Sequence, residues 1–316
     1  MKQLTIICPA LNEIKFIEQV IHDLCVADGI DKEVLIVDGG SMDGTQMKVK
    51  SLMAIYSNLK LVNNPRKTST AAFNIGVSES QSTYVAFVGA HARYSNGYFT
   101  NAINELNTNS CDAVGGPLQQ EGKTLVGKGI AVAMQSKVGV GNTEFRTSNE
   151  RKYVDSVAFA IYRRSMIDKA GLMDESLPVN QDDEFHYRIN SLGFKILMIP
   201  EMSSVYYVRD SYIGLFKQYF KYGLYKPTVL KKVKGAVKLR HLIPAFFCLY
   251  LFSLPVGLYF NFWFLFLFVY LLLITVAALM INEKLTIKIV AIPAFLILHL
   301  SYGLGFIIGL IKNKKT

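Results

Sequence analysis

The sequence has few cysteines and no long apolar run at its N-terminus. Only four cysteines occur in 316 residues, and none of them forms a CxxC pair or a metal-ligand spacing. This excludes a disulfide scaffold and a zinc module and indicates reduced, mostly buried thiols in a cytosol-facing protein. The first apolar run is too short for a secretory leader, so the N-terminal domain is expected to stay in the cytoplasm.

Acidic residues are almost absent from the last third of the chain. Residues 1–210 contain 21 Lys and Arg against 23 Asp and Glu, whereas residues 211–316 contain 13 against a single acid, Glu283. The lysines flank apolar runs rather than forming a soluble patch, which argues against nucleic-acid binding. The pattern instead favours an anionic membrane face.

Three apolar stretches have about the length that spans a bilayer, ~20 residues each. They are residues 242–260, 262–281 and 289–311. Three spans would place the C-terminal lysines opposite the basic cluster that precedes the first span, while the positive-inside rule favours both clusters in the cytoplasm. One segment is therefore a candidate for a re-entrant helix, and the last, with Pro293 and three glycines, is the first choice.

These features predict three parts. Residues 1–210 are expected to form a catalytic domain, residues 211–241 an amphipathic basic segment at the membrane surface, and residues 242–316 a transmembrane region. The expected location is the inner membrane, with the catalytic domain on the cytoplasmic side.

Short strands and helices alternate in the first two thirds of the chain. This alternation predicts an α/β fold with a mostly parallel sheet and helices on both faces. Pro9 is expected to end the first strand, and the Gly-rich region 120–150 is predicted to be a mobile loop or lid. The expected strands are 4–8, 34–37, 59–62, 84–88, 153–162, 195–199 and 203–208, and the expected helices are 45–56, 71–78, 184–192 and 212–225.

The most informative motif is Asp38-Gly39-Gly40-Ser41-Met42-Asp43-Gly44-Thr45. It follows a β-branched run and precedes a helix, so it places backbone N–H groups and a carboxylate at the carboxyl end of a strand. Open α/β sheets bind their ligands at that edge. Glycines there permit positive φ or close approach to a ligand, while Ser41 and Asp43 can cap the helix.

Together with Cys8-Pro9-Ala10-Leu11-Asn12-Glu13, this motif resembles family 2 glycosyltransferases of the GT-A fold. The two segments match the family patterns P-x-x-N-E and D-(G/D)-(G/S)-S-x-D-G-T, in the form found in ExoA-like enzymes of exopolysaccharide synthesis. The resemblance covers residues 4–225 and implies that Glu13 and Asp38 hold the nucleoside of a nucleotide-sugar. The backbone around Pro9 is suited to accept hydrogen bonds from the base and ribose.

A second segment, Asn64 to Gly76, resembles the family stretch that ends in N-x-G. Asn74 and Gly76 are expected to organise the turn and the helix packing, and Arg66 and Lys67 face either phosphate or solvent. The residues predicted to bind the nucleotide-sugar are Pro9, Leu11, Glu13, Asp38, Gly40, Arg66, Lys67, Asn74, Ala90, Arg209 and Lys221.

The sequence departs from the family after the central strand. Most members have D-x-D there, which holds Mg²⁺ or Mn²⁺ on the donor diphosphate, whereas this chain has Gly89-Ala90-His91. A neutral imidazole suits Mn²⁺ better than Mg²⁺. Three interpretations stay open: His91 holds a divalent metal with donor oxygens and water, cationic side chains replace the metal, or His91 is only a satisfied polar residue.

Gln181-Asp182-Asp183-Glu184-Phe185-His186-Tyr187-Arg188 resembles the family pattern E-D-x-D/E-L-x-x-R. The match places Asp182 at the catalytic general base. Inverting transfer needs one carboxylate opposite the leaving diphosphate, and an aspartate with an ordinary pKa of ~3.9 is ionised at neutral pH. Asp183 and Glu184 have plainer interpretations, as a loop charge and as a first-turn charge near the helix dipole.

Gln218-Tyr219-Phe220-Lys221-Tyr222 resembles, in weakened form, the Q-x-x-R-W motif of membrane polysaccharide synthases. Lys221 replaces the arginine, so bidentate phosphate binding is lost, and Arg209 is a candidate to supply a guanidinium instead. The plainer interpretation of Lys221 is a lysine whose charge reaches the headgroups from a surface helix.

The resemblance thus implies a membrane-anchored, inverting glycosyltransferase. It is expected to move one sugar from a UDP-sugar to a lipid-linked saccharide or polysaccharide acceptor in exopolysaccharide or cell-envelope glycan synthesis. One alternative is a nucleotide-sugar-binding protein without catalysis, suggested by Gly89. The other is a nucleotidyltransferase, which would need a Gly-rich basic loop where this chain has Pro9-Ala10-Leu11-Asn12.

Overall fold

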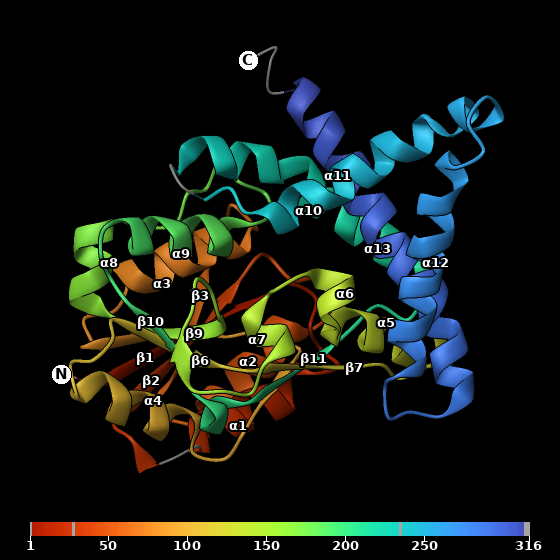
Figure 1. Ribbon diagram of the computed structural model, residues 1–316. Coiled ribbons are helices and arrows are strands. Elements are labelled where there is room, and N and C mark those ends of the chain that lie inside the picture. The colour runs from red at the N-terminus through yellow and green to blue at the C-terminus, as the bar shows by residue number, and fades with distance from the viewer. Residues whose placement is uncertain (1, 27–28, 234–235, 313–316) are drawn as a thin grey trace. The chain divides into compact units, whose positions relative to one another are not determined.

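The computed structural model describes residues 2–26, 29–233 and 236–312 (Figure 1). The chain forms two compact units. The sheet unit comprises Met1–Leu118 and Ser148–Tyr206, and the helical unit comprises Gln119–Thr147 and Tyr207–Thr316. The predicted three-part division stays a prediction, and Lys234 and the C-terminal residues 313–316 lie outside the described residues.

The sheet unit contains an eight-stranded, mixed sheet in the order β3-β2-β1-β4-β9-β6-β10-β8. The pairs β1–β2, β1–β4, β2–β3 and β6–β10 are parallel, whereas β9 runs antiparallel between β4 and β6. The strands are β1 Leu4–Ala10, β2 Lys32–Asp38, β3 Leu59–Asn63, β4 Tyr84–Phe87, β6 Ala113–Gly116, β8 Lys152–Tyr153, β9 Ala158–Arg163 and β10 Ile196–Met198. This arrangement agrees with the predicted α/β fold.

Pro9 does not end the first strand, as the sequence had suggested. β1 continues to Ala10, and Pro9 is paired with Val37 of β2. On the other side of β1, the ladder with β4 ends at the Ile7–Phe87 pair. Pro9 therefore lies where β1 has become an edge on that side, and its missing N–H breaks no ladder hydrogen bond.

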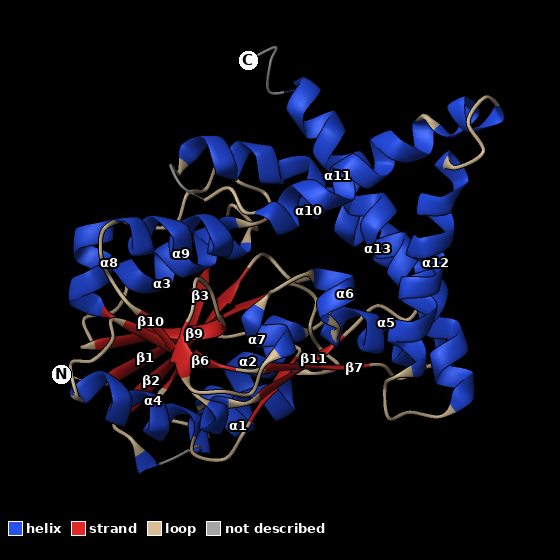
Figure 2. Ribbon diagram, viewed as in Figure 1, coloured by secondary structure: helices blue, strands red, loops and turns tan. Residues whose placement is uncertain are grey.

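Helices cover both faces of the sheet (Figure 2). Leu4, Ile6 and Cys8 of β1 belong to one core with residues of α1 Ile17–Val26, α2 Thr45–Met53 and α4 Tyr98–Asn107. The alternate residue Ile7 faces α3 Ser69–Ser78, where a Cβ on Gly76 would lie 2.6 Å from the Ile7 side chain. The period of two in β1 therefore divides its side chains between two helical layers.

The α3 layer also contains α9, Gln181–Ser191, and is packed with aromatic rings. The ring of Phe73 on α3 lies 5.2 Å from Phe87, 6.0 Å from Tyr162 and 5.8 Å from Phe185 of α9. Neighbouring elements of the sheet unit are β5 Ala92–Tyr94, α8 Arg164–Ala170, α9 Gln181–Ser191, the 3-10 helix η2 Pro200–Met202 and β11 Ser204–Tyr207. β5 pairs antiparallel with β11, and the single strand expected at 153–162 is in fact β8 and β9.

The predicted mobile loop at 120–150 is wrong. This region forms β7 Leu118–Glu121, α5 Leu125–Gln135, α6 Lys137–Val140 and α7 Glu144–Thr147. A Cβ on Gly129 would lie 2.7 Å from Val290, and one on Gly139 would lie 2.0 Å from the Ala133 carbonyl oxygen. The glycines there mark close backbone packing rather than a loop, which sequence periodicity does not reveal.

The rest of the helical unit consists of α10 Tyr212–Lys232, α11 Leu239–Phe252, the 3-10 helix η3 Leu254–Leu258, α12 Trp263–Leu279 and α13 Leu285–Lys312. In the described part of the chain, α13 alone is long and apolar enough to cross a membrane. The first two expected spans correspond to shorter helices of 14 and 17 residues.

Candidate functional site

The loops that follow β1 and β2 are joined by hydrogen bonds between side chains and backbone. The Asn12 backbone N–H donates to Ser41 Oγ at 2.8 Å, and the Met42 N–H donates to Asn12 Oδ1 at 2.9 Å. The Glu13 N–H donates to Thr45 Oγ1 at 2.8 Å. Asn12 has a positive φ of 58°, a conformation that asparagine tolerates better than most residues. The two motifs that suggested the function therefore form one structural element.

Asp38 holds the turn after β2 together. Its side chain is almost completely buried, and Oδ1 accepts hydrogen bonds from the backbone N–H groups of Gly40 at 2.9 Å and Ser41 at 2.8 Å. The Gln46 side chain donates to the same oxygen at 2.6 Å, and the Ser41 hydroxyl donates to Oδ2. Gly40 has a φ of 85°, which most side chains disfavour. Asp38 thus shapes the loop, and its contact with a nucleoside stays a prediction.

Asp43 is not the N-cap residue of α2, which is Gly44, with a φ of 98° and no side-chain hydrogen bond. Its carboxylate nevertheless accepts from the first backbone N–H of the helix, that of Thr45, at 3.1 Å. It also accepts from the Thr45 hydroxyl at 2.6 Å and from the Ile14 backbone N–H at 3.1 Å. The hydrogen bond from the Thr45 side chain is the main reason that the pKa of Asp43 is lowered.

The predicted nucleoside ligand and the predicted metal ligand contact each other. His91 Nε2 lies 2.8 Å from Glu13 Oε1, and the Phe16 ring packs edge-on against the imidazole at 5.0 Å. The Glu13 side chain is 13% exposed and that of His91 is 52% exposed. The pair therefore presents one oxygen and one nitrogen at the carboxyl edge of the sheet, beside the joined loops.

A tertiary contact explains why the first family aspartate is missing. A Cβ on Gly89 would lie 2.9 Å from Phe159 Cε1, so the phenyl ring fills the space of a side chain at position 89. The Gly89 N–H donates to Tyr94 Oη at 2.8 Å, which fixes the strand end against a second ring. Phe159 itself has a positive φ of 49°, unusual for a bulky residue.

The donor set for a divalent metal is accordingly small. Within residues 2–26, 29–233 and 236–312, no group of three or more His, Cys, Asp or Glu side chains is placed to hold an ion. Glu13 and His91 offer at most two ligands, and His91 would have to turn Nε2 away from Glu13. The residues therefore fit a metal only if oxygens of a bound diphosphate and water complete its coordination.

Asp182 lies exposed in the first turn of α9, at the helix N-terminus. Behind it is a buried polar group that the sequence analysis missed. The His186 ring lies between Tyr162 Oη, at 2.8 Å from Nε2, and Ser156 Oγ, at 2.9 Å from Nδ1. Burial lowers the pKa of His186 to about 4, so the ring is neutral at pH 7. Burial, with the nearby charge of Asp182, raises the pKa of Tyr162.

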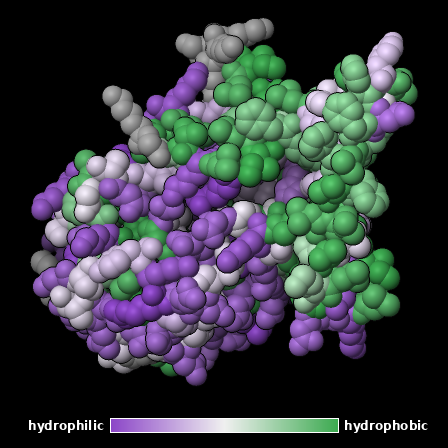
Figure 3. Space-filling view, in the orientation of Figure 1, coloured by the Kyte–Doolittle hydropathy of each residue, from purple (hydrophilic) through white to green (hydrophobic). Residues whose placement is uncertain are grey.

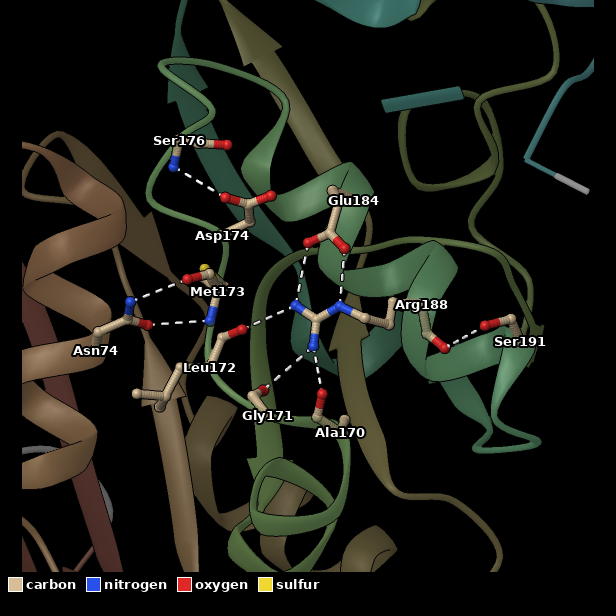
Figure 4. Close-up of polar contacts among 10 residues, drawn as sticks. All are labelled: Asn74, Ala170, Gly171, Leu172, Met173, Asp174, Ser176, Glu184, Arg188 and Ser191. Carbon is tan, nitrogen blue, oxygen red and sulfur yellow. Dashed lines mark hydrogen bonds and ion pairs between the residues drawn. The ribbon is translucent and has the colours of Figure 1, made fainter. Parts of the chain in front are cut away.

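Arg188 holds α9 to the turn that follows α8 (Figure 4). Its guanidinium binds Glu184 through two hydrogen bonds, of 2.8 and 3.1 Å, and donates to the carbonyl oxygens of Ala170 and Leu172. Glu184 lies in the first turn of α9, as predicted, and it is 4% exposed, so it is also a buried ion-pair partner. Asp183 lies within α9 rather than in a loop.

Asn74 and Arg66 both contact the segment that follows this turn. The Asn74 side-chain oxygen accepts from the Met173 N–H at 3.0 Å, and its amide donates to the Met173 carbonyl at 2.9 Å (Figure 4). The same amide donates to Glu175 at 2.8 Å. Arg66 forms an ion pair with Glu175 at 2.8 Å. Both residues were predicted to bind the nucleotide-sugar, and the structure gives each a protein partner.

The remaining predicted residues are divided between the two units. Lys67 is exposed, and its Nζ lies 3.9 Å from the position of a Cβ on Gly40, so its charge sits over the β2 turn. Leu11 is 43% exposed and Ala90 is 5% exposed. Arg209 and Lys221 are exposed residues of the helical unit.

Comparisons with known proteins agree with this geometry. The family described as glycosyl transferase family 2 matches residues 5–171. The succinoglycan biosynthesis protein ExoA of Rhizobium meliloti (strain 1021) is 31% identical over 242 residues, which cover 76% of this chain and 73% of that protein.

A protein of Methanococcus voltae is 28% identical over 333 residues, covering 100% of this chain and 99% of that one. It is named dolichyl N-acetyl-alpha-D-glucosaminyl phosphate 3-beta-D-2,3-diacetamido-2,3-dideoxy-beta-D-glucuronosyltransferase.

Solved structures confirm the predicted GT-A fold. Mannosyltransferase PcManGT of Pyrobaculum calidifontis, in complex with GDP-Man and Mn²⁺, has a TM-score of 0.63 at 18% identity, covering 99% of this chain and 87% of that one. S. aureus TarS 1–349, in complex with UDP-GlcNAc, has a TM-score of 0.53 at 15% identity, covering 96% and 91%.

Proposed function

The chain belongs to glycosyl transferase family 2, and we propose that it transfers a sugar, with inversion, from a UDP-sugar to a lipid-linked saccharide or polysaccharide acceptor. In this proposal residues 1–210 are catalytic, 211–241 lie at the membrane surface and 242–316 enter the membrane. Relatives named for succinoglycan biosynthesis and for a dolichyl-phosphate-linked substrate support such an acceptor. The TarS complex with UDP-GlcNAc supports a UDP-linked donor.

The observation that carries the proposal is the joined pair of loops after β1 and β2. Their hydrogen bonds bring Glu13, Asp38 and Gly40 to one edge of the sheet, with Lys67 above the turn. The carboxyl edge of an open α/β sheet is where nucleotides bind. In the proposed complex the base and ribose lie against the loop backbone around Pro9, Leu11 and Ala90. The side chain of Lys67 faces the diphosphate.

In the proposed reaction Asp182 accepts the proton of the acceptor hydroxyl. The acceptor oxygen forms a bond to the anomeric carbon, the bond from that carbon to the diphosphate breaks, and UDP leaves with the bonding electrons. The proton ends on the Asp182 carboxylate, whose exposed place at the start of α9 leaves it open to an acceptor. Beneath Asp182, the uncharged side chains of Tyr162 and His186 are hydrogen-bonded to each other and pack under this end of α9.

The family metal would be held by Glu13 and His91 together with donor oxygens, and when bound it would neutralise charge on the leaving diphosphate. PcManGT was solved with Mn²⁺, which supports this choice of ion. Arg66, Lys67, Arg209 and Lys221 are the cationic residues proposed to assist.

Membrane association is proposed from the helical unit. Figure 3 shows hydrophobic residues gathered over α11 and α12, and α10 carries exposed Lys217 and Lys221. This combination fits an enzyme whose acceptor is lipid-linked and whose catalytic side faces the cytoplasm at the inner membrane.

The test compares Asp182→Asn with its neighbour Asp183→Asn in the full chain. A panel of UDP- and GDP-sugars is first screened by thermal shift, since a ligand of the native state raises its stability. Release of nucleotide is then measured with membrane lipid extract as the source of acceptor. Asp182→Asn should lower kcat by about 100-fold or more with little change in donor affinity.

Asp183→Asn should keep most of the activity. Full activity in Asp182→Asn would remove Asp182 from the mechanism. Donor binding with no turnover by the wild-type chain would favour a binding protein without catalysis.

A further inference from the structure

The segment between α8 and α9 is bound by side chains from two different helices. This segment, residues 171–180, is here called the connector. Figure 4 shows that its first residues lie beside Arg188 of α9 and that Met173 lies beside Asn74 of α3. Arg188 donates to the Leu172 carbonyl oxygen at 2.8 Å, and Asn74 pairs with the next residue, Met173. Two adjacent residues of the connector are therefore tied to two helices.

Asn74 binds both backbone groups of one connector residue. The Met173 N–H donates to Asn74 Oδ1 at 3.0 Å, and Asn74 Nδ2 donates to the Met173 carbonyl oxygen at 2.9 Å. The same amide donates to Glu175 Oε1 at 2.8 Å. Asn74 is 6% exposed and Met173 is 3% exposed, so protein shields the paired groups from water. Because hydrogen bonds are directional, this pairing fixes the connector along α3 as well as across it.

Arg188 holds the beginning of the connector against α9. Gly171 has a φ of 81°, and the carbonyl oxygens of the residues on either side of it, Ala170 and Leu172, both accept from the guanidinium. Glu184 binds the same guanidinium through two hydrogen bonds, of 2.8 and 3.1 Å. A planar guanidinium can hold a carboxylate and carbonyl oxygens at the same time in a fixed geometry, which a lysine ammonium does not reproduce.

α3, the other anchor of the connector, is packed on the strand that leads to Glu13. A Cβ on Gly76 of α3 would lie 2.6 Å from the side chain of Ile7 in β1. The direct contact between α3 and α9 is apolar, with the rings of Phe73 and Phe185 5.8 Å apart. Apolar packing is not directional, so it holds the two helices together without fixing their relative shift. The hydrogen bonds of the connector supply that constraint.

We propose that Asn74 and Arg188 are positioning residues for sugar transfer. Acting through the connector, they set the place of Asp182, at the start of α9, relative to the joined loops after β1 and β2. Asn74 then affects the transfer step rather than the binding of the nucleotide-sugar. The inference rests on the proposed role of Asp182 as general base. Misplacing a reacting group by about 1 Å can lower a rate on the order of 100-fold.

The kinetic test uses Asn74→Ala in the full chain, with Ser78→Ala as the matched control. Ser78 is an exposed residue one turn further along α3, and its hydroxyl donates only to the Asn74 carbonyl oxygen of the same helix. Asn74→Ala should lower kcat about 30-fold or more and change the donor dissociation constant less than about twofold. Ser78→Ala should keep both values. An unchanged kcat in Asn74→Ala, or a donor affinity that falls as far as kcat, would overturn the proposal.

A second variant acts on the connector from the other side. Arg188→Lys keeps a positive charge near Glu184 but loses the planar donors that reach the connector, and it should give the same kinetic pattern as Asn74→Ala. The double variant should be little slower than the slower single variant, because both residues act through one segment. Rate losses that multiply in the double variant would show that the two residues act independently.

Amide hydrogen exchange keeps this inference separate from the proposed reaction, because it needs no substrate. Asn74→Ala should raise the exchange rate in the connector and in the first turn of α9, and leave the joined loops after β1 and β2 at the wild-type rate. Wild-type exchange at the start of α9 in this variant would overturn the positioning role. The expected exchange pattern, combined with a wild-type chain that transfers sugar from no donor in the panel, would count only against the proposed reaction.

Discussion

The ends of β2 and β4 lie at the same edge of the sheet but are built in different ways. At the end of β2, polar side chains bind one another and the backbone, with Asp38 accepting from Gly40, Ser41 and Gln46. At the end of β4, aromatic rings fill the space, and Phe159 occupies the volume of a side chain at Gly89.

The comparison explains why one family motif is intact and the other is not. The polar groups after β2 depend on each other, so replacing Asp38 leaves several partly buried donors without acceptors. After β4 the Phe159 ring takes the space of a side chain at position 89, and Glu13 and His91 supply polar groups nearby.

The largest effect is expected at Asp38. Asp38→Ala should lower the free energy of unfolding by about 3 kcal/mol, because four hydrogen bonds to a buried carboxylate are lost. Urea denaturation measures this change. The matched control Asp168→Ala removes an exposed ion pair with Arg164 and should cost less than about 1 kcal/mol. Equal losses in the two variants would mean that the β2 loop does not depend on its aspartate.

Lowering the pH should reduce the folding stability of the protein, because His186, which is buried behind Asp182, becomes protonated on unfolding. Because the pKa of His186 is about 4 in the folded protein and 6.5 in the unfolded chain, the unfolded chain binds more protons between these values. The stability contribution of His186 is complete above pH 6.5 and is lost as the pH falls toward 4, by about 3 kcal/mol.

His186→Gln should flatten this part of the stability curve, whereas His22→Gln, which changes an exposed histidine, should leave it unchanged. Unfolding free energies measured from pH 4 to 7 compare the variants. A wild-type slope that survives in His186→Gln would assign the pH dependence to other groups.

A double-mutant cycle tests the packing at the end of β4. Gly89→Asp should destabilise the fold by about 2 kcal/mol, because its Cβ overlaps the Phe159 ring. In a Phe159→Ala background the same change should cost less, with a coupling energy of about 1 kcal/mol measured by urea unfolding. Strict additivity would mean that the ring does not exclude the family aspartate.

The smallest effects are expected in the loop after β3. Arg66→Ala should change the unfolding free energy by less than about 1 kcal/mol, since the Arg66 side of its ion pair with Glu175 is exposed to solvent. It should also leave the donor KM nearly unchanged, whereas Lys67→Ala, beside Gly40, should raise that KM. If steady-state kinetics show that Arg66→Ala raises the donor KM and Lys67→Ala does not, Arg66 is the phosphate ligand.

Much of the fold follows from local pattern. The alternation of strands and helices and the glycine-rich turn after a β-branched strand were sufficient for the α/β architecture and the ligand edge. The Glu13–His91 contact and the buried His186 were not predictable, because both depend on which distant segments meet. A histidine in the middle of a polar helix carries no local sign that the hydroxyls of Ser156 and Tyr162 will flank its ring.

The sequence by itself determined the chemistry of the two joined loops and the need of α11, α12 and α13 for an apolar environment. Only the tertiary structure decided what supplies that environment. Close contacts at glycines such as Gly305 cover part of α13 with protein, while many apolar side chains of α12 stay exposed. The physical reason is that hydrophobicity requires removal from water but does not specify the partner, which depends on long-range packing.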